Sequence, residues 1–306
     1  MTWRGSSPCG HWAPPGDGPR RVRGAGVRLV FLGTGGPIPD PARHGPALVV
    51  TRRETLVMVD AGRGAARQLV LAGLDPGRLD AVVLTHLHLD HISDLGDVLI
   101  SSWLMGRRGA IQVVGPPGTA GVVDALVTGV YGPDIAIRSR EPLFGDWPPV
   151  TVREVEPGES FRIADLTFEA GAVVHGQGLF ADGEAAARWV TLGYRVAAGG
   201  RLLALSGDTI RCPGLESLAR GADLLVMCCY IADVEVDNEH RRRVVDLLLA
   251  SSSEAGRAAA AAGVPRVALT HFRRTSAEMV HRMEQDVRAV FGGDVIVAED
   301  LLAVDV

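Results

Sequence analysis

The feature that most constrains the fold of this chain is a heptad at residues 85–91, which reads Thr-His-Leu-His-Leu-Asp-His. A continuous apolar run at residues 81–84 precedes it, and apolar positions recur with roughly helical spacing from residue 92 to residue 100. The pattern predicts a buried strand, a tight polar turn and then a helix. Four side chains of the turn are potential metal ligands: His86, His88, Asp90 and His91.

The spacing of these side chains favours two neighbouring binding points. A tight turn aims His86 and His88 at one point, and Asp90 and His91 at a second point close by. Imidazole and carboxylate ligands suit zinc and similar divalent metals, whereas calcium and magnesium sites are dominated by oxygen. The alternative is a polar loop with incidental histidines, but three histidines and one aspartate in six residues argue against it.

The turn resembles the HxHxDH signature of the metallo-β-lactamase superfamily. The resemblance implies an α/β fold of the αββα type, in which two mixed β-sheets are stacked between outer helices. It also implies three further metal ligands, each of which follows an apolar run later in the chain: His175, Asp208 and His271.

The resemblance further implies how the metals are shared. One metal would lie on His86, His88 and His175, and a second on Asp90, His91 and His271, with Asp208 between them. Two Zn²⁺ ions are the expected cofactors, with Mn²⁺ or Fe as alternatives. We interpret Asp60, which follows an early strand, either as a hydrogen-bond acceptor for a ligating histidine or as the cap of a helix near Arg63.

The implied activity is hydrolysis by a hydroxide held between two cations, whose bound water has a lowered pKa. Asp90 and Asp208 would be the catalytic carboxylates, Asp90 by orienting the hydroxide or accepting its proton. A phosphodiester, a sulfate ester, a lactone or a related small ester is the expected substrate, and the ligands alone do not distinguish these. The alternative is a member of the superfamily with a redox or binding function.

Residues 29–37 narrow the resemblance to the ribonuclease Z, arylsulfatase and cyclic phosphodiesterase branch, which covers nearly all of residues 27–275. The chain departs from ribonuclease Z in three places. Met227 and Cys228 stand where that enzyme has a histidine–glutamate pair, Leu249 replaces a further histidine, and only 32 residues separate His175 from Asp208. That interval has no room for a tRNA-binding arm.

These departures, with a net charge of −5, argue against a nucleic-acid partner and favour a small-molecule substrate. A ribonuclease Z-type RNA endonuclease is therefore the less favoured alternative. Arginines near the last ligand and near His240 are candidates for binding an anion, although solvated surface arginines are the simpler interpretation. They are Arg273, Arg274, Arg241, Arg242 and Arg243.

Composition bounds the organisation of the chain. With 306 residues and 47% hydrophobic side chains, the chain is long enough for one large domain, expected at residues 27–306. Residues 1–26 are rich in Gly, Pro and Arg, lack the apolar core of a signal peptide and are expected to form a disordered tail. No apolar run of about 18 residues exists, so we expect a cytoplasmic protein without a membrane partner. Four cysteines have no zinc-ribbon spacing and are expected to be free thiols.

Patterning also predicts individual elements. Strands are expected at 27–33, 46–51, 55–60, 81–85, 266–270 and 294–298, and helices at 63–73, 118–130, 239–250, 254–262 and 276–291. The apolar helix at 94–105 is a candidate homodimer surface, and the alternative is that it is buried within one chain. Six aromatic side chains are candidate pocket walls, with core packing as the alternative: Trp103, Trp147, Trp189, Tyr131, Phe180 and Tyr230.

Overall fold

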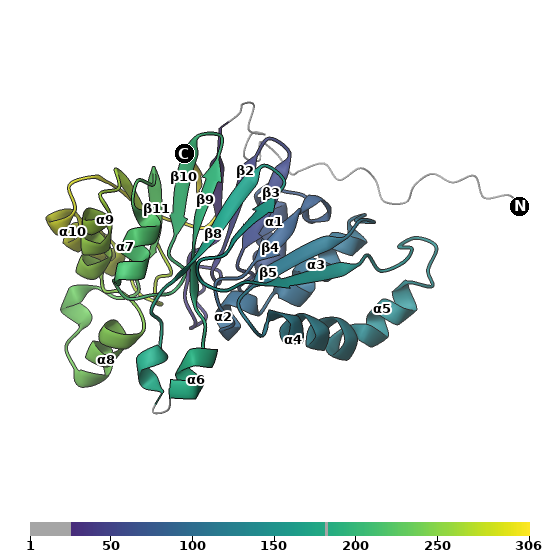
Figure 1. Ribbon diagram of the computed structural model, residues 1–306, viewed down its shortest axis with the longest axis horizontal. Helices are drawn as coiled ribbons and strands as arrows, with labels where there is room; N and C mark the ends of the chain where they lie inside the picture. Colours follow the sequence, from purple (N-terminus) through teal and green to yellow (C-terminus); the bar gives the residue numbers. More distant parts are fainter. Residues whose placement is uncertain (1–25, 181–182) are drawn as a thin grey trace, which may run out of the picture.

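Two seven-stranded β-sheets form the centre of the protein, and helices cover their outer faces (Figure 1). The computed structural model describes residues 26–180 and 183–306. The expected disordered tail, residues 1–26, lies outside the described residues apart from Gly26. The α/β sandwich expected from the sequence is confirmed.

The first sheet contains the strands of the N-terminal half and the last strand of the chain. Its order is β14-β1-β2-β3-β4-β5-β6. The bounds are Arg28–Gly33 for β1, Ala47–Arg52 for β2, Thr55–Val59 for β3, Ala81–Val83 for β4, Ile111–Gly115 for β5, Val150–Glu154 for β6 and Ala303–Asp305 for β14. Neighbours from β14 to β3 are antiparallel, and those from β3 to β6 are parallel.

The second sheet has the same construction. Its order is β13-β12-β11-β10-β9-β8-β7. The bounds are Ser160–Ile163 for β7, Leu166–Ala172 for β8, Leu192–Ala198 for β9, Arg201–Leu205 for β10, Leu224–Cys228 for β11, Arg266–Thr270 for β12 and Asp294–Val297 for β13. Pairs from β7 to β10 are antiparallel and those from β10 to β13 are parallel. The two sheets of the protein are therefore built alike.

Helices complete the outer layers and the ends of the sheets (Figure 1). The N-terminal half contains, between β3 and β6, the helices α1 Ala65–Leu71, α2 Leu89–Ile92, α3 Leu95–Leu104, α4 Thr119–Asp124 and α5 Gly132–Arg138. The second half contains α6 Gly183–Arg188, α7 Pro213–Ala219, α8 Glu239–Leu247, α9 Ser252–Ala262 and α10 Ala277–Val290. Short 3-10 turns lie at Pro76–Arg78, Gln177–Leu179 and Asp233–Glu235.

Three apolar clusters hold these layers together. The central cluster lies between the sheets and includes Phe31, Phe168 and Tyr194, all fully buried. A second cluster joins the second sheet to α7, α9 and α10, and a third joins the first sheet to α1, α3 and α4. Strands that are apolar on both faces are typical of a sheet covered on both sides, which explains the continuous apolar runs in the sequence.

The helical segment after β5 differs from the expected single helix at 118–130. The α-helical pattern ends at Asp124 and gives way to a π-helix at Ala125–Val130, after which the chain bends into α5. Tyr131 from this bend packs over Gly96 of α3, where a Cβ would lie 2.2 Å from the ring. The apolar side of α3, including Leu95 and Trp103, is buried within the chain. Of the two interpretations of this helix, burial is the correct one.

Among the described residues, no single helix is both long and apolar enough to cross a membrane. One pair of helices separated by a 60° bend, Thr119–Val130 with Gly132–Arg138, meets that criterion by length and composition only.

Candidate metal centre

The candidate ligands lie where strands of both sheets end. His86 and His88 follow β4, and Asp90 and His91 lie on α2 directly after the same turn. The remaining three come from the second sheet: His175 follows β8, Asp208 follows β10 and His271 follows β12. All seven predicted ligands are brought together, and all except the half-buried His88 are buried.

Unusual backbone conformations position several of these side chains. Asp60 directly follows β3 and His271 directly follows β12. Their φ angles are 58° and 60°. Gly207, next to Asp208, has a φ of 59°, and a Cβ there would lie 2.7 Å from the Leu192 carbonyl oxygen. Because side chains with positive φ are strained, these positions indicate that the fold enforces the geometry of the site.

The first ligand group consists of His86, His88, His175 and Asp208. The Nδ1 atom of His88 lies 3.0 Å from Nε2 of His86 and 3.0 Å from Nε2 of His175. One ligand atom from each of the four residues can be chosen so that all lie within 4.8 Å of one another. Three ring nitrogens therefore converge on a single point.

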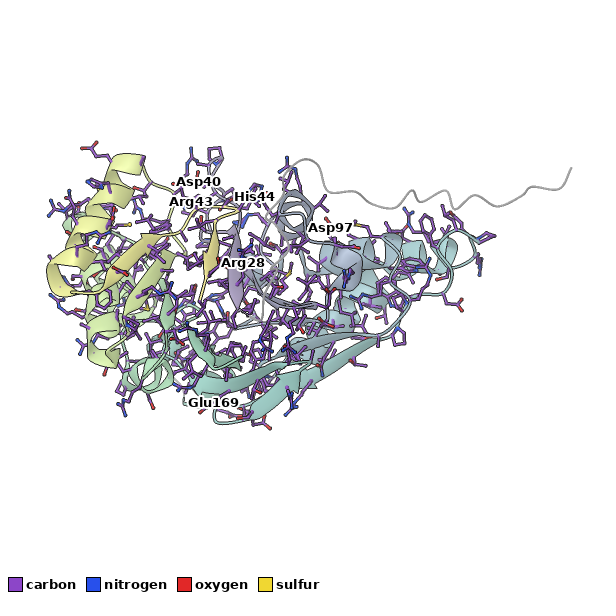
Figure 2. All side chains as sticks on the ribbon, turned by 90° about the horizontal axis from the view of Figure 1, so that it is seen from above. Arg28, Asp40, Arg43, His44, Asp97 and Glu169 are labelled. Atoms are coloured by element: carbon purple, nitrogen blue, oxygen red, sulfur yellow. The ribbon has the colours of Figure 1, made fainter. Side chains whose placement is uncertain are left out.

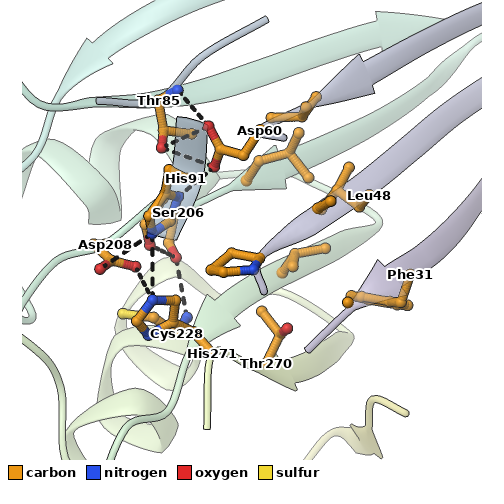
Figure 3. A pocket seen from close by; sticks show the side chains of 17 residues that line it. Phe31, Leu48, Asp60, Thr85, His91, Ser206, Asp208, Cys228, Thr270 and His271 are labelled. Atoms are coloured by element: carbon orange, nitrogen blue, oxygen red, sulfur yellow. Dashed lines mark hydrogen bonds and ion pairs between the residues drawn. The ribbon is translucent and has the colours of Figure 1, made fainter. Parts of the chain in front are cut away.

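The second ligand group consists of Asp90, His91 and His271. Nε2 of His271 lies 3.3 Å from Nε2 of His91 and 3.3 Å from Oδ2 of Asp90. Asp208 faces both groups. Its Oδ1 is 3.2 Å from His271 Nε2 and its Oδ2 is 3.5 Å from His91 Nε2 (Figure 3). On the side of the first group, Oδ2 lies 3.9 Å from His86 Nε2. This is the arrangement of a carboxylate shared by two metals.

Hydrogen bonds on the outer side of the rings test whether the site fits a metal. Nδ1 of His86 contacts Thr85 Oγ1 at 3.0 Å, Nδ1 of His91 contacts Asp60 Oδ2 at 2.8 Å, and Nδ1 of His175 contacts the Leu248 carbonyl at 2.7 Å. When these Nδ1 atoms donate, each Nε2 presents a lone pair to the centre. Converging lone pairs cannot all satisfy one another, so the donor set fits divalent cations of the zinc type.

Burial and neighbouring charges favour the metal-binding protonation states of His86, His88 and Asp208. His91 differs: burial opposes the shift, but the carboxylates of Asp208 and Asp60 raise its pKa well above the usual value. Burial, together with nearby imidazoles, lowers the pKa of His86 well below its usual value and lowers that of His88 to about 4. Burial alone would raise the pKa of Asp208, but the imidazoles of His271 and His91 hold it well below its usual range. Neutral imidazoles and ionised carboxylates are the forms that bind metals.

Asp60 lies behind the second ligand group rather than at the start of a helix. Its carboxylate accepts hydrogen bonds from the Thr85 backbone N at 2.8 Å and from His91 Nδ1 at 2.8 Å (Figure 3). The alternative interpretation of Asp60 as a helix cap is wrong. Helix α1 begins after Gly64, and its Ala66 N–H donates to the carboxylate of Asp94 at 2.8 Å.

Two of the six aromatic side chains that are candidate pocket walls lie beside the candidate metal centre. Trp189 lies 4.7 Å from His88, ring centroid to ring centroid, and Tyr230 lies 6.2 Å from His271. Trp103, by contrast, is fully buried against Trp147 at 5.2 Å and forms no wall of the site. Trp189 also donates from Nε1 to the His175 carbonyl at 2.8 Å, which holds its ring beside the first group.

Arg273 and Glu235 form an ion pair next to Tyr230. Nη2 of Arg273 lies 2.9 Å from Glu235 Oε1, and the Arg273 backbone N donates to the Tyr230 carbonyl. Burial raises the pKa of Tyr230, the guanidinium of Arg273 opposes that shift, and Asp208 and Asp90 add to it. Glu235 could not be found from sequence, because only the fold brings it to residue 273.

A small pocket of about 40 Å³ is lined by three of the candidate ligands, His91, Asp208 and His271, together with apolar residues of both sheets (Figure 3). Asp60, Ser206, Asp208, Cys228 and His271 are among its lining residues. The thiols of Cys212, Cys228 and Cys229 are free and buried, as expected. Burial, with Asp208 nearby, raises the pKa of Cys228 to about 12, so this thiol is neutral and inert.

Comparisons with known proteins identify the family. A family model described as the beta-lactamase superfamily domain matches residues 55–272, which include all seven candidate ligands. The chain belongs to the metallo-β-lactamase superfamily. It is a metal-dependent hydrolase of that superfamily, as the sequence predicted.

Relatives and solved structures agree with this assignment. The chain is 36% identical over 292 residues to a protein named Ribonuclease Z from Mycobacterium marinum, which covers 92% of this chain and 99% of that protein. The metallo-β-lactamase fold protein YhfI from Bacillus subtilis has a similar structure, with a TM-score of 0.70, 18% identity and coverage of 92% and 100%. The short form of human tRNase Z gives a TM-score of 0.63 at 22% identity, with coverage of 90% and 98%.

The relatives overturn the prediction that the partner is a small molecule and not a nucleic acid. Met227, Cys228 and Leu249 are indeed buried apolar residues beside the site. The mycobacterial relative is nevertheless matched over 99% of its length, so the short interval from His175 to Asp208 does not set this chain apart from a protein named Ribonuclease Z. The absence of an arm between His175 and Asp208 is therefore no evidence against an RNA partner.

Proposed function

We propose that this protein is a dinuclear-metal phosphodiesterase that cleaves RNA in the manner of a ribonuclease Z. The observation that carries the proposal is the 36% identity, over nearly the whole of both chains, to a protein of that name. The geometry is compatible with it, because two ligand groups share Asp208 at a centre open enough to leave His88 half-buried.

The proposed ligand sets are those expected from the sequence. His86, His88 and His175 would hold one ion, and Asp90, His91 and His271 the other, with Asp208 shared. We propose Zn²⁺ for both, because imidazoles outnumber carboxylates in the two groups. When bound, two such ions lower the pKa of a water molecule and polarise the phosphodiester that it attacks.

The side chains have separate roles in this proposal. Asp90 accepts the proton of the attacking water at Oδ2, which faces His271. The guanidinium of Arg273, oriented by Glu235, supplies positive charge for a phosphate oxygen, and the hydroxyl of Tyr230 donates a hydrogen bond beside it. Trp189 shields the first group from solvent on its other side. A new bond forms between the water oxygen and phosphorus, and the bond from phosphorus to the leaving nucleotide oxygen breaks.

A direct test uses purified, zinc-loaded protein and a precursor tRNA labelled at its 5′ end. Expected are cleavage near the 3′ end of the tRNA body, about two metal ions per chain, and loss of cleavage in Asp208→Ala. A DNA oligonucleotide of the same sequence and bis(p-nitrophenyl) phosphate serve as comparison substrates. Hydrolysis of the small ester with no cleavage of the RNA would refute the RNA substrate while leaving the hydrolase assignment intact. The cytoplasmic location stays a prediction.

A further inference from the structure

The starting observation is the strained backbone of His271, whose φ is 60°. A left-handed backbone conformation is unfavourable for a residue with a side chain, and it persists only where surrounding contacts enforce it. The next residue supplies such a contact, because the Phe272 backbone N donates to the Thr34 carbonyl at 2.9 Å. Gly35 also pairs with Phe272 as an isolated parallel bridge.

The loop from Thr34 to His44 therefore lies against the last metal ligand. A Cβ built on Gly36 would be 3.2 Å from Cε1 of the His271 ring, so the loop backbone closely approaches the imidazole. Arg43 clamps the same point: its guanidinium lies 4.6 Å from the centre of the Phe272 ring, and its Nη1 donates to the Ala298 carbonyl at 2.9 Å. Figure 2 shows Arg43 and His44 close together on this loop.

A single carboxylate holds both ends of the loop. Oδ1 of Asp300 accepts from the Thr34 backbone N at 3.0 Å and from Thr34 Oγ1 at 2.8 Å. Oδ2 of Asp300 contacts the His44 backbone N at 2.7 Å and His44 Nδ1 at 2.8 Å. The carboxylate is mostly buried, with its side chain 14% exposed. Since hydrogen bonds to an ionised acceptor are the strong ones, Asp300 determines where the loop lies.

The backbone next to the Asp300 carboxylate is also strained. Leu301, directly after Asp300, has a φ of 67°, and its N–H donates to the Phe31 carbonyl at 2.6 Å. The turn returns the chain to β14, which pairs with β1 immediately before the Thr34 loop. Contacts therefore run from Leu301 through its neighbour Asp300 to Thr34, and from Thr34 to Phe272 and its neighbour His271. The two strained residues, His271 and Leu301, lie at the two ends of this series.

We propose that Asp300 is a positioning residue for the second ligand group. It contacts neither metal nor substrate, and it acts through Thr34 and Phe272 to hold His271 toward Asp90 and His91. The inference rests on the metal centre of the proposed function and is independent of the substrate that the enzyme cleaves.

The test is a calorimetric titration of metal-free protein with Zn²⁺ alone. Wild-type protein is expected to bind two ions, and Asp300→Asn is expected to weaken one site by about 10–100-fold and leave the other unchanged. Asparagine has the same shape as aspartate, but one of its two terminal atoms is an NH2 group. That group cannot accept the hydrogen bonds that Thr34 and His44 donate to the Asp300 carboxylate. Asp305→Asn is the matched control, because the carboxylate of Asp305 pairs with Arg28 and is 71% exposed. Both metal sites of this variant should keep wild-type affinity.

The outcomes are distinguishable. Two sites of wild-type affinity in Asp300→Asn, or equal weakening of both, would overturn the role of Asp300. A wild-type protein without two sites would overturn the metal centre of the proposed function, and this inference with it.

A second pair of variants covers the case in which Asp300→Asn does not fold. Thr34→Ala removes one hydroxyl donor to Asp300 but keeps the backbone donor, and should weaken the same site by a smaller factor. Thr34→Ser keeps that hydroxyl and should restore the affinity. Equal affinities in the alanine and serine variants would contradict the proposal.

Discussion

The hydroxyl of Tyr194 donates a 2.8 Å hydrogen bond to the carbonyl of Leu84, which joins the second sheet to the turn that carries the first metal ligands. Both residues are fully buried. Next to this bond, the Leu192 backbone N donates to the Thr85 carbonyl at 2.9 Å. The ligand turn is therefore fixed from the opposite sheet as well as from its own.

Tyr194→Phe tests this connection. The variant leaves a buried carbonyl without its donor, so we expect a loss of about 1–3 kcal/mol in the free energy of unfolding and weaker metal binding by the first ligand group. Denaturant unfolding and metal titration measure the two effects. Tyr131→Phe is the control, because the described residues contain no hydrogen-bond partner for its hydroxyl. Equal stability of the two variants would show that the bond contributes nothing.

Substitution of the shared ligand should be the most damaging change at the site. Asp208→Ala removes the carboxylate that faces both groups, so we expect fewer than two bound metal ions and a fall in kcat of more than about 100-fold. His281→Ala, whose side chain on α10 is 66% exposed, should leave both unchanged. Full activity in Asp208→Ala would remove the basis of the two-metal proposal.

Asp60→Asn examines the carboxylate behind His91. An asparagine can no longer accept all the hydrogen bonds from Thr85 and from His91 Nδ1, so the tautomer and orientation of His91 become less well fixed. Metal affinity is expected to fall by about 10–100-fold, with the second group affected. Asp80→Asn, which only caps the Leu56 N–H, provides the comparison in the same titration. Unchanged affinity in Asp60→Asn would mean that Asp60 only supports the fold.

Removal of the metals should destabilise the whole protein. The ligands are buried, and a bound ion stabilises the native state by about 4 kcal/mol for each site when its free concentration is about 1,000 times Kd. Thermal unfolding before and after chelator treatment should show a large fall in Tm that added Zn²⁺ reverses. The fall should be smaller in Asp208→Ala. A Tm insensitive to the chelator would contradict metal binding by the folded state.

An ion pair between the two sheets should make stability depend on pH. Arg52 of β2 pairs with Asp165, which lies between β7 and β8, and Thr55 Oγ1 donates to the same carboxylate at 2.8 Å. Burial opposes the shift, but Thr55 and Arg52 lower the pKa of Asp165. Because the folded-state pKa is depressed, the stabilisation is present above the unfolded pKa of about 3.9 and is lost as pH falls through the folded value.

Asp165→Asn should therefore be less stable than wild type at pH 7, and the gap should narrow below about pH 4. Unfolding by denaturant at several pH values measures it. A gap that stays constant down to the lowest pH would assign the effect to packing rather than to charge.

Local sequence patterns predicted much of the fold. The strand at Arg266–Thr270 and the helices near α9 and α10 were expected within a few residues, because apolar periodicity and helix caps act over short distances. The last strand, β14, was missed because its three residues are recognisable only through pairing with β1. The π-helix at Ala125–Val130 was missed because no local signal separates it from an α-helix.

In the candidate site, too, residues with a local sequence signal were predicted and residues that act over long sequence distances were not. The sequence identified the seven side chains that the fold brings together, because metal chemistry restricts the residue types and the resemblance supplied their order. Glu235 and Asp300 were not predicted, since each acts on residues more than 35 positions away and carboxylates are common on any surface. A nucleic-acid partner was not expected, because the short interval from His175 to Asp208 and the net charge of −5 argue against one. The relatives named Ribonuclease Z contradict that expectation.

The candidate ligands are divided between the two halves of the protein, which links metal binding to folding. Each candidate ligand group combines side chains that follow β4 with side chains that follow strands of the second sheet. Neither half can bind an ion with its complete set. The proposed metal sites are therefore complete only when the two sheets are packed together, which couples metal binding to the folded sandwich.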